Sequence, residues 1–108
     1  MEWDKVLQTV TSDPTREVID ATSLKNLAAL VKYGASKLTP PSDVGNGYYP
    51  TALLSWDSLQ TQIEVFHDHF EIYDFEVVPA RIRHVAVEVA GQLPSQLLPL
   101  LAPLKLPS

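Results

Sequence analysis

The chain has no cysteine among its 108 residues. This absence excludes disulfide bonds, thiol nucleophiles and every zinc site that is built from thiolates. A chain without cysteine also suits a reducing compartment. The sequence begins Met1-Glu2-Trp3-Asp4, with acidic residues where a secretory signal would carry basic ones. We therefore expect a cytoplasmic protein.

Basic residues are few, with eight Lys and Arg against thirteen Asp and Glu, so the net charge is −5. Nucleic-acid binding depends on clustered basic side chains that contact phosphates, and here the basic residues are scattered. We expect no direct binding to nucleic acid and no attraction to anionic membrane surfaces. Long apolar runs are missing too, because no stretch approaches the ~20 apolar residues that a membrane span needs.

Motifs of catalysis and cofactor binding are also missing. The sequence contains no Gly-x-Ser-x-Gly, no His-Glu-x-x-His and no calcium-binding loop. Gly45-Asn46-Gly47 is followed by tyrosines rather than by the Lys of a phosphate-binding loop. We expect no cofactor, and the balance of these absences favours a non-catalytic protein.

What is present indicates an α+β fold in a single domain, residues 1–108. The first part, residues 1–38, carries two apolar stripes at helical spacing. A break at Ser12-Asp13-Pro14 separates the two helices. Gly34 is the predicted end of the second, with a frayed turn to Leu38 as an alternative continuation. The residues of the two stripes are Trp3, Val6, Leu7 and Val10, then Leu24, Leu27, Ala28 and Val31.

Residues 39–50 are rich in Pro and Gly and are predicted to form a loop. Residues 51–78 then carry β-branched and aromatic residues between turn signals, which predicts a three-stranded antiparallel β-meander. The helices of the first part are expected to cover its apolar face.

The last part, residues 79–108, is predicted to hold one or two C-terminal helices. Over residues 81–89 the apolar spacing favours a helix, although Val85, Val87 and Val89 also alternate as in a fourth strand. In that helix His84 and Glu88 would form an i, i+4 pair. The remaining Leu/Pro-rich tail is expected to form a short helix that its prolines interrupt.

The clearest local feature is a β-hairpin that runs from about Thr61 to Val77 and turns at His67-Asp68-His69. A two-residue turn sets Val65 against Phe70 on an apolar face, and Glu64 against Glu71 on the other face. Two facing carboxylates repel, so a longer turn is the alternative, and the sequence leaves the register open.

Three interpretations compete for this hairpin. The first is an ordinary solvated tip, which is the commonest role of charged hairpin ends. The second is a divalent metal site formed by His67, His69, Glu64 and Glu71. The third is an acidic surface, including Asp68, that binds a basic partner protein.

Two further segments are candidates for partner binding. Tyr48 and Tyr49 follow a flexible turn, and tyrosine is common at interfaces. In the tail, Leu97 and Leu101 either complete the core of their own domain or dock on another chain, most simply in a homodimer.

The sequence therefore predicts a small protein-interaction or regulatory protein, of an antitoxin, immunity or adaptor kind. It would act through the acidic hairpin face and the apolar tail. The alternative is a small metal-dependent or acid–base enzyme that uses His67, His69, Glu64 and Glu71. No motif specific to a known family accompanies either prediction.

Overall fold

The computed structural model describes residues 2–12, 19–46 and 50–107 of the chain. Two helices come first, followed by an antiparallel sheet, so the predicted α+β class is confirmed. In chain order the elements are α1 (Trp3–Ser12), α2 (Ala21–Lys37), β1 (Asp43–Asn46), β2 (Ala52–Trp56), the 3-10 helix η1 (Asp57–Leu59), β3 (Thr61–Val65), β4 (His69–Asp74), β5 (Arg81–Ala86) and the 3-10 helix η2 (Leu98–Leu104).

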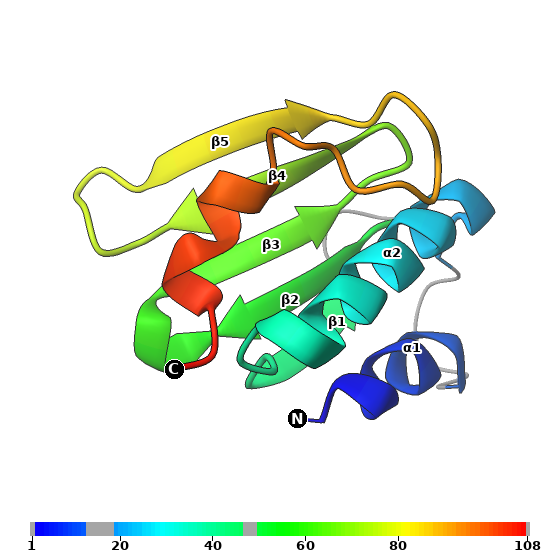
Figure 1. Ribbon diagram of the computed structural model, residues 1–108, viewed down its shortest axis with the longest axis horizontal. Coiled ribbons are helices and arrows are strands. Elements are labelled where there is room, and N and C mark those ends of the chain that lie inside the picture. The colour runs from blue at the N-terminus through cyan, green and yellow to red at the C-terminus, as the bar shows by residue number, and fades with distance from the viewer. Residues whose placement is uncertain (1, 13–18, 47–49, 108) are drawn as a thin grey trace.

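The sheet has five strands in the order β1-β2-β3-β4-β5, and each strand pairs antiparallel with its neighbour in sequence. The helices α1 and α2 and the 3-10 helix η2 lie on one side of it (Figure 1). Alternate residues of every strand therefore face this helical layer, and the others face away from it.

The prediction of three strands was wrong because two strands were missed. The first is β1, which lies inside the predicted loop 39–50 and pairs Val44 with Leu54 of β2. It is four residues long and contains Gly45 and Asn46, so it carries no strand periodicity of its own. This segment is a strand because it pairs with β2, and not because its own residues favour a strand.

The second missed strand is β5, where a helix over 81–89 was predicted. Its six residues all pair with β4, from Arg81 opposite Asp74 to Ala86 opposite His69. The apolar residues of this segment fit both a helical and an alternating period, and pairing with the neighbouring strand decided between them. The strand alternative holds only as far as Ala86, where β5 ends.

In place of C-terminal α-helices the chain ends in η2, a 3-10 helix that contains Pro99 and Pro103. Prolines lack the backbone N–H that an α-helix needs at its interior positions. Leu97, Leu101 and Leu104 are each at most 1% exposed and belong to the main hydrophobic core. The tail therefore packs on its own domain.

Helix α2 continues past Gly34 to Lys37, so the segment that was predicted as a frayed turn to Leu38 is helical as far as Lys37. Gly34 is buried against Trp3 of α1, and a Cβ there would lie 2.5 Å from Cζ2 of the Trp3 ring. The glycine therefore permits the close approach of the two helices. Trp3 also donates from its indole nitrogen to the carbonyl of Leu38, at 3.0 Å. Among the described residues, no helix is both long enough and apolar enough to cross a membrane.

Candidate functional site

The β3–β4 hairpin has the two-residue turn at His67-Asp68. Phe66 N donates to the His69 carbonyl at 3.0 Å, and Val65 lies opposite Phe70. Glu64 consequently does lie opposite Glu71, on the face of the sheet that points away from the helices. The structure thus contains the carboxylate pair that made this register look unfavourable.

Tyr73 relieves the repulsion between these carboxylates. Its hydroxyl lies 2.6 Å from Oε1 of Glu71 and 2.9 Å from Oε1 of Glu64, so its single proton is shared between them. Thr51 donates to the other oxygen of Glu64 at 2.6 Å, and Glu64 is only 5% exposed. Burial, followed by the two carboxylates, raises the pKa of the Tyr73 hydroxyl and keeps it protonated.

The His69 side chain contacts two carboxylates and two rings. Its Nδ1 lies 2.6 Å from Oδ1 of Asp68, and its Nε2 lies 2.8 Å from Oε2 of Glu71. Its ring stacks between those of Phe66 and His84, with centroid distances of 4.0 and 4.1 Å. Burial lowers the pKa of His69, but the hydrogen bonds to the two carboxylates outweigh it, so the pKa is raised.

The pKa values of Asp68 and Glu71, the acidic partners of His69, shift in the opposite direction. The hydrogen bond to His69 lowers the pKa of Asp68. The hydrogen bond from Tyr73 lowers the pKa of Glu71 against the opposing effect of burial, and His69 adds to the lowering. These shifts favour the ionised carboxylates of Asp68 and Glu71 and the protonated form of His69.

This arrangement does not favour the metal or acid–base alternatives. Within the described ranges, no group of three or more His, Asp or Glu side chains is placed to hold a metal ion. Both ring nitrogens of His69 already have carboxylate partners, whereas a metal ligand or a general base needs one nitrogen with a free lone pair. His67 is well exposed, and its Nε2 lies 3.7 Å from Oδ2 of Asp68.

The candidates for partner binding differ in accessibility. Asp68 is exposed at the turn, with 61% of its side chain accessible, while Glu64 is buried. Leu97 and Leu101 lie in the core and present no surface to another chain. Tyr48 and Tyr49 lie outside the described residues.

Asn26 is a buried polar residue that the sequence analysis missed. It is 1% exposed, and its side-chain amide donates to the carbonyls of Phe66 and His67 at 2.9 and 3.1 Å. Its carbonyl oxygen accepts from the backbone N–H of Gly91 at 3.0 Å. Helix α2 thereby fixes both the hairpin turn and the loop that follows β5. Only the three-dimensional contacts reveal this role, because Asn26 lies off the apolar stripe.

Strand β5 forms one edge of the sheet, which the sequence analysis could not foresee after predicting a helix there. The hydrogen bond from Val87 N to the Asp68 carbonyl, at 2.8 Å, fixes the phase of the β4–β5 ladder. Because antiparallel bonding alternates, the backbone groups of Ile82, His84 and Ala86 point away from β4, toward the outer edge. Figure 1 shows β5 as the outermost strand, with no described strand beyond it.

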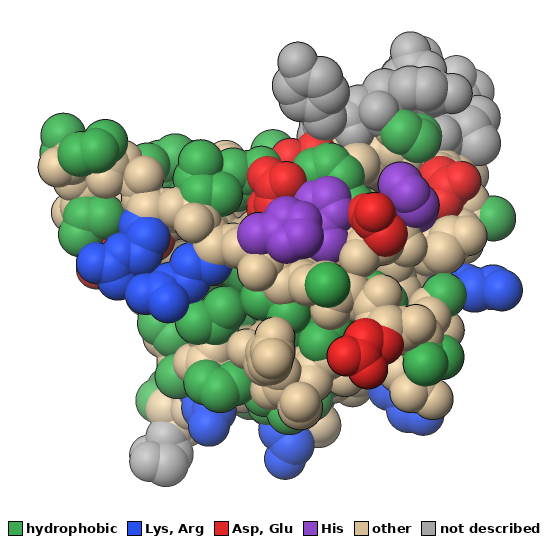
Figure 2. Space-filling view, turned by 90° about the horizontal axis from the view of Figure 1, so that it is seen from above, with side chains coloured by type: hydrophobic (Ala, Val, Ile, Leu, Met, Phe, Trp, Pro, Cys, Tyr) green, Lys and Arg blue, Asp and Glu red, His purple; other side chains and the backbone are tan. Residues whose placement is uncertain are grey.

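Exposed side chains gather around this edge. Residues Arg81–His84 are all exposed. Large apolar side chains are also exposed in and beside the β4–β5 hairpin, namely Phe75, Val77, Val78, Ile82 and Val89. Figure 2, seen from the β5 side, shows apolar and basic side chains at one end and histidine and acidic side chains toward the other. The open edge therefore combines apolar surface with backbone groups that pair with no other described strand.

Comparison of the chain with protein-family models, with curated proteins and with solved structures gives no match in any of the three. The class of protein is thus defined by the fold alone. It is a small α+β protein whose five-stranded antiparallel meander is covered by helices on one face.

Proposed function

We propose that this is a non-catalytic protein-interaction protein that self-associates through the outer edge of β5. The observation that carries the proposal is the edge itself, with its six residues and the outward backbone groups of Ile82, His84 and Ala86. Exposed strand edges of this kind pair with other strands unless something blocks them.

A two-fold axis at His84 gives a suitable pairing with a second copy. His84 then lies opposite its own counterpart, and Ile82 lies opposite Ala86, so that all outward backbone groups form about six hydrogen bonds. Residues of equal parity share a face, which keeps both helical layers on the same side of a continuous sheet. Arg83 lies opposite Val85 in this register, so no arginine faces another.

The other surfaces support self-association less well. Strand β1, at the opposite edge, has only four residues and packs beside α1. The hairpin carboxylates Glu64 and Glu71 already have hydrogen-bond partners within the network. The interaction function expected from the sequence is therefore retained, but its proposed surface moves to β5.

The test is the molecular mass in solution over a wide range of concentration, by sedimentation or light scattering. We expect a dimer of twice the 12.0 kDa chain mass. His84→Pro should shift it to monomer, because proline removes an outward N–H without removing a bond to β4. Ile82→Ser should also weaken the dimer.

Leu106→Ser is the matched control, since it removes an exposed apolar side chain away from β5 and should leave the dimer intact. Circular dichroism verifies that each variant is folded. A wild-type protein that is monomeric at every concentration, or a folded His84→Pro variant that remains dimeric, would contradict the proposal.

A further inference from the structure

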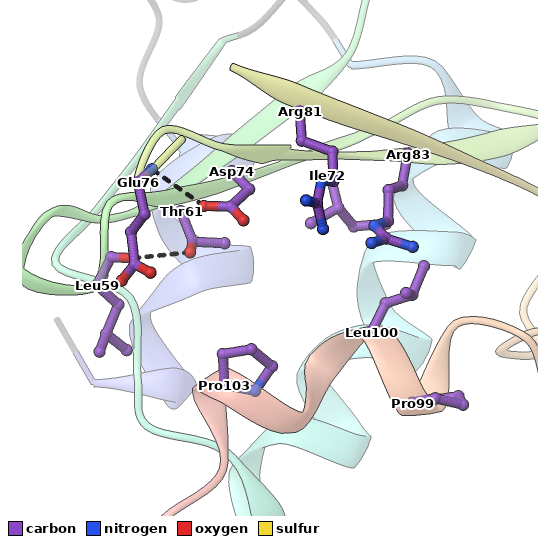
Figure 3. Close-up of a pocket in the computed structure, with 10 residues that line it drawn as sticks. All are labelled: Leu59, Thr61, Ile72, Asp74, Glu76, Arg81, Arg83, Pro99, Leu100 and Pro103. Carbon is purple, nitrogen blue, oxygen red and sulfur yellow. Dashed lines mark hydrogen bonds between the residues drawn. The ribbon is translucent and has the colours of Figure 1, made fainter. Parts of the chain in front are cut away.

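A pocket of about 260 Å³ lies between η2 and the sheet, on the helix-covered side of β3, β4 and β5. Its apolar lining includes Ile72 of β4 with Leu100 and Pro103 of η2. Arg81 and Arg83 of β5 line the same pocket, and Figure 3 shows both side chains directed into it. It is separate from the hairpin network, which lies on the opposite face of the sheet.

Only one of the two arginines occupies a position that is apolar elsewhere in the sheet, because Arg81 lies in register with Asp74 and, through it, with Thr61. Arg83 lies in register with Ile72 and, through it, with the fully buried Ile63. The three arginines of the chain are Arg16, outside the described residues, and these two. Within the described ranges neither Arg81 nor Arg83 has an acidic side chain within 4.0 Å. Two guanidinium groups are thus directed into a partly apolar pocket, and neither forms an ion pair with another described residue.

Asp74 and Glu76 also line the pocket, and they determine which anion suits it. The backbone N–H of Glu76 donates to Oδ1 of Asp74 at 3.0 Å, which fixes this carboxylate at one end. In Figure 3 Glu76 lies toward Leu59 and Asp74 lies beside Thr61, whereas Arg83 lies toward Leu100. Two positive and two negative groups leave no net charge for a dianion such as phosphate. The guanidinium end still matches a single carboxylate, which arginine can bind through two parallel hydrogen bonds.

We propose that this pocket binds a compact organic carboxylate with an apolar body. The carboxylate lies at Arg81 and Arg83, and the apolar body lies against Ile72, Leu100 and Pro103. Pockets that bind small ligands commonly combine apolar walls with a few convergent polar groups in this way. The proposal does not depend on pairing at β5, because the pocket opens on the helical side and not on the outer backbone edge.

The test is a chemical-shift titration of the ¹⁵N-labelled protein with 4-methylpentanoate. We expect saturable shifts concentrated at the amides of Thr61, Ile72 and Leu100. The neutral analogue 4-methylpentanamide and the short acid acetate should each bind at least about tenfold more weakly, since each lacks one half of the recognised chemistry. Inorganic phosphate should give no saturable shift at these amides.

Two further probes distinguish the source of the carboxylate. The tripeptide Gly-Gly-Leu carries it at a chain terminus, and its C-terminally amidated form lacks it. Tighter binding of 4-methylpentanoate than of the free tripeptide indicates a small-molecule ligand, and the reverse order indicates a peptide C-terminus. Either order supports the carboxylate site, whereas equal binding of the free and amidated tripeptides, with no binding of 4-methylpentanoate, overturns it.

Arg83→Gln should weaken the binding of 4-methylpentanoate by about tenfold, because it removes a charged donor while keeping much of the side-chain length. Lys105→Gln is the matched control, since it removes an exposed positive charge that does not line the pocket. Equal effects of the two variants, or shifts spread evenly over the molecule, would overturn the proposal. A negative result here would leave the pairing at β5 untouched.

Discussion

One row of residues across the sheet contrasts its centre with its edge. Ile63, Ile72 and Arg83 lie side by side on β3, β4 and β5, on the same face. The two isoleucines are buried, whereas the arginine is exposed. The difference follows the covering layer, because near β5 that layer is reduced to η2 with its prolines (Figure 1). The central strands therefore supply stability, and the edge strand is available for binding.

The largest change in the free energy of unfolding is expected for a substitution in this row. Ile63→Ala is expected to lower the free energy of unfolding by about 2–5 kcal/mol, since it leaves a cavity in a fully packed core. Arg83→Ala, in the same row, should change it by less than about 0.5 kcal/mol. Urea denaturation measures both values. Similar losses in the two variants would break the contrast between centre and edge.

The covering layer gives the next prediction. Gly34→Ala should lower the free energy of unfolding by about 1–3 kcal/mol, because the new methyl group would overlap Trp3. This is opposite in sign to the gain of up to about 1 kcal/mol that alanine gives in an exposed helix. Thermal denaturation provides the measurement, with the exposed Ser36→Ala on the same helix as control. Stabilisation by Gly34→Ala would show that α1 and α2 are less closely packed than described.

On the face of the sheet that points away from the helices, Tyr73→Phe should lower the free energy of unfolding by about 1–2 kcal/mol. The variant removes the proton that lies between the carboxylates of Glu64 and Glu71 and leaves them facing each other. Tyr33→Phe is the matched control, because no hydrogen bond of the Tyr33 hydroxyl occurs among the described residues, and it should have little effect. If urea denaturation finds the two variants equally stable, the shared-proton arrangement is wrong.

The smallest effect is a pH dependence that His69 introduces. Its pKa is raised above 6.5 in the folded protein, so its contribution is complete below 6.5 and is lost as the pH rises through the folded value. The pKa values of Asp68 and Glu71 are lowered from 3.8 and 4.5, so their contribution is present above those values and is lost on acidification.

The stability lost in His69→Gln should therefore be largest between about pH 4.5 and 6.5 and should shrink on either side. Its size should stay below about 1 kcal/mol, because the Asp68 partner is solvent-exposed. Urea denaturation across this pH range, with the exposed His67→Gln as control, provides the comparison. A difference that does not vary with pH would exclude the ion pair.

The central strands of the sheet could be predicted from the sequence better than the edge strands. The apolar alternation of Ile63, Val65, Phe70 and Ile72 was sufficient to predict the β3–β4 hairpin, although the facing glutamates left its register open. The role of Tyr73 was within reach, since it lies two residues from Glu71 on the same face. Pairing of directly opposite residues alone, which sets Gln62 against Tyr73, does not reveal this contact.

The edges depended on information that is not local. Residues 81–86 fit two periods, and only pairing with β4 made them a strand. Once they were assigned to a helix, Arg81 and Arg83 could not be placed on the covered face of a sheet. Likewise, β1 forms a strand because it pairs with β2, and not because of a pattern in its own residues. Long-range pairing of this kind is the part of a fold that single-sequence patterns represent least well.

Residue-level amide hydrogen exchange at high and low protein concentration tests the pairing of two copies at β5. We expect the outward amides of Ile82, His84 and Ala86 to be protected at high concentration and to exchange rapidly on dilution. The inward amides of Arg83 and Val85 should stay protected in both conditions, because they bond to β4. Rapid exchange of the outward amides at every concentration would contradict pairing at this edge. Rapid exchange of the inward amides would contradict the assignment of β5 as a strand.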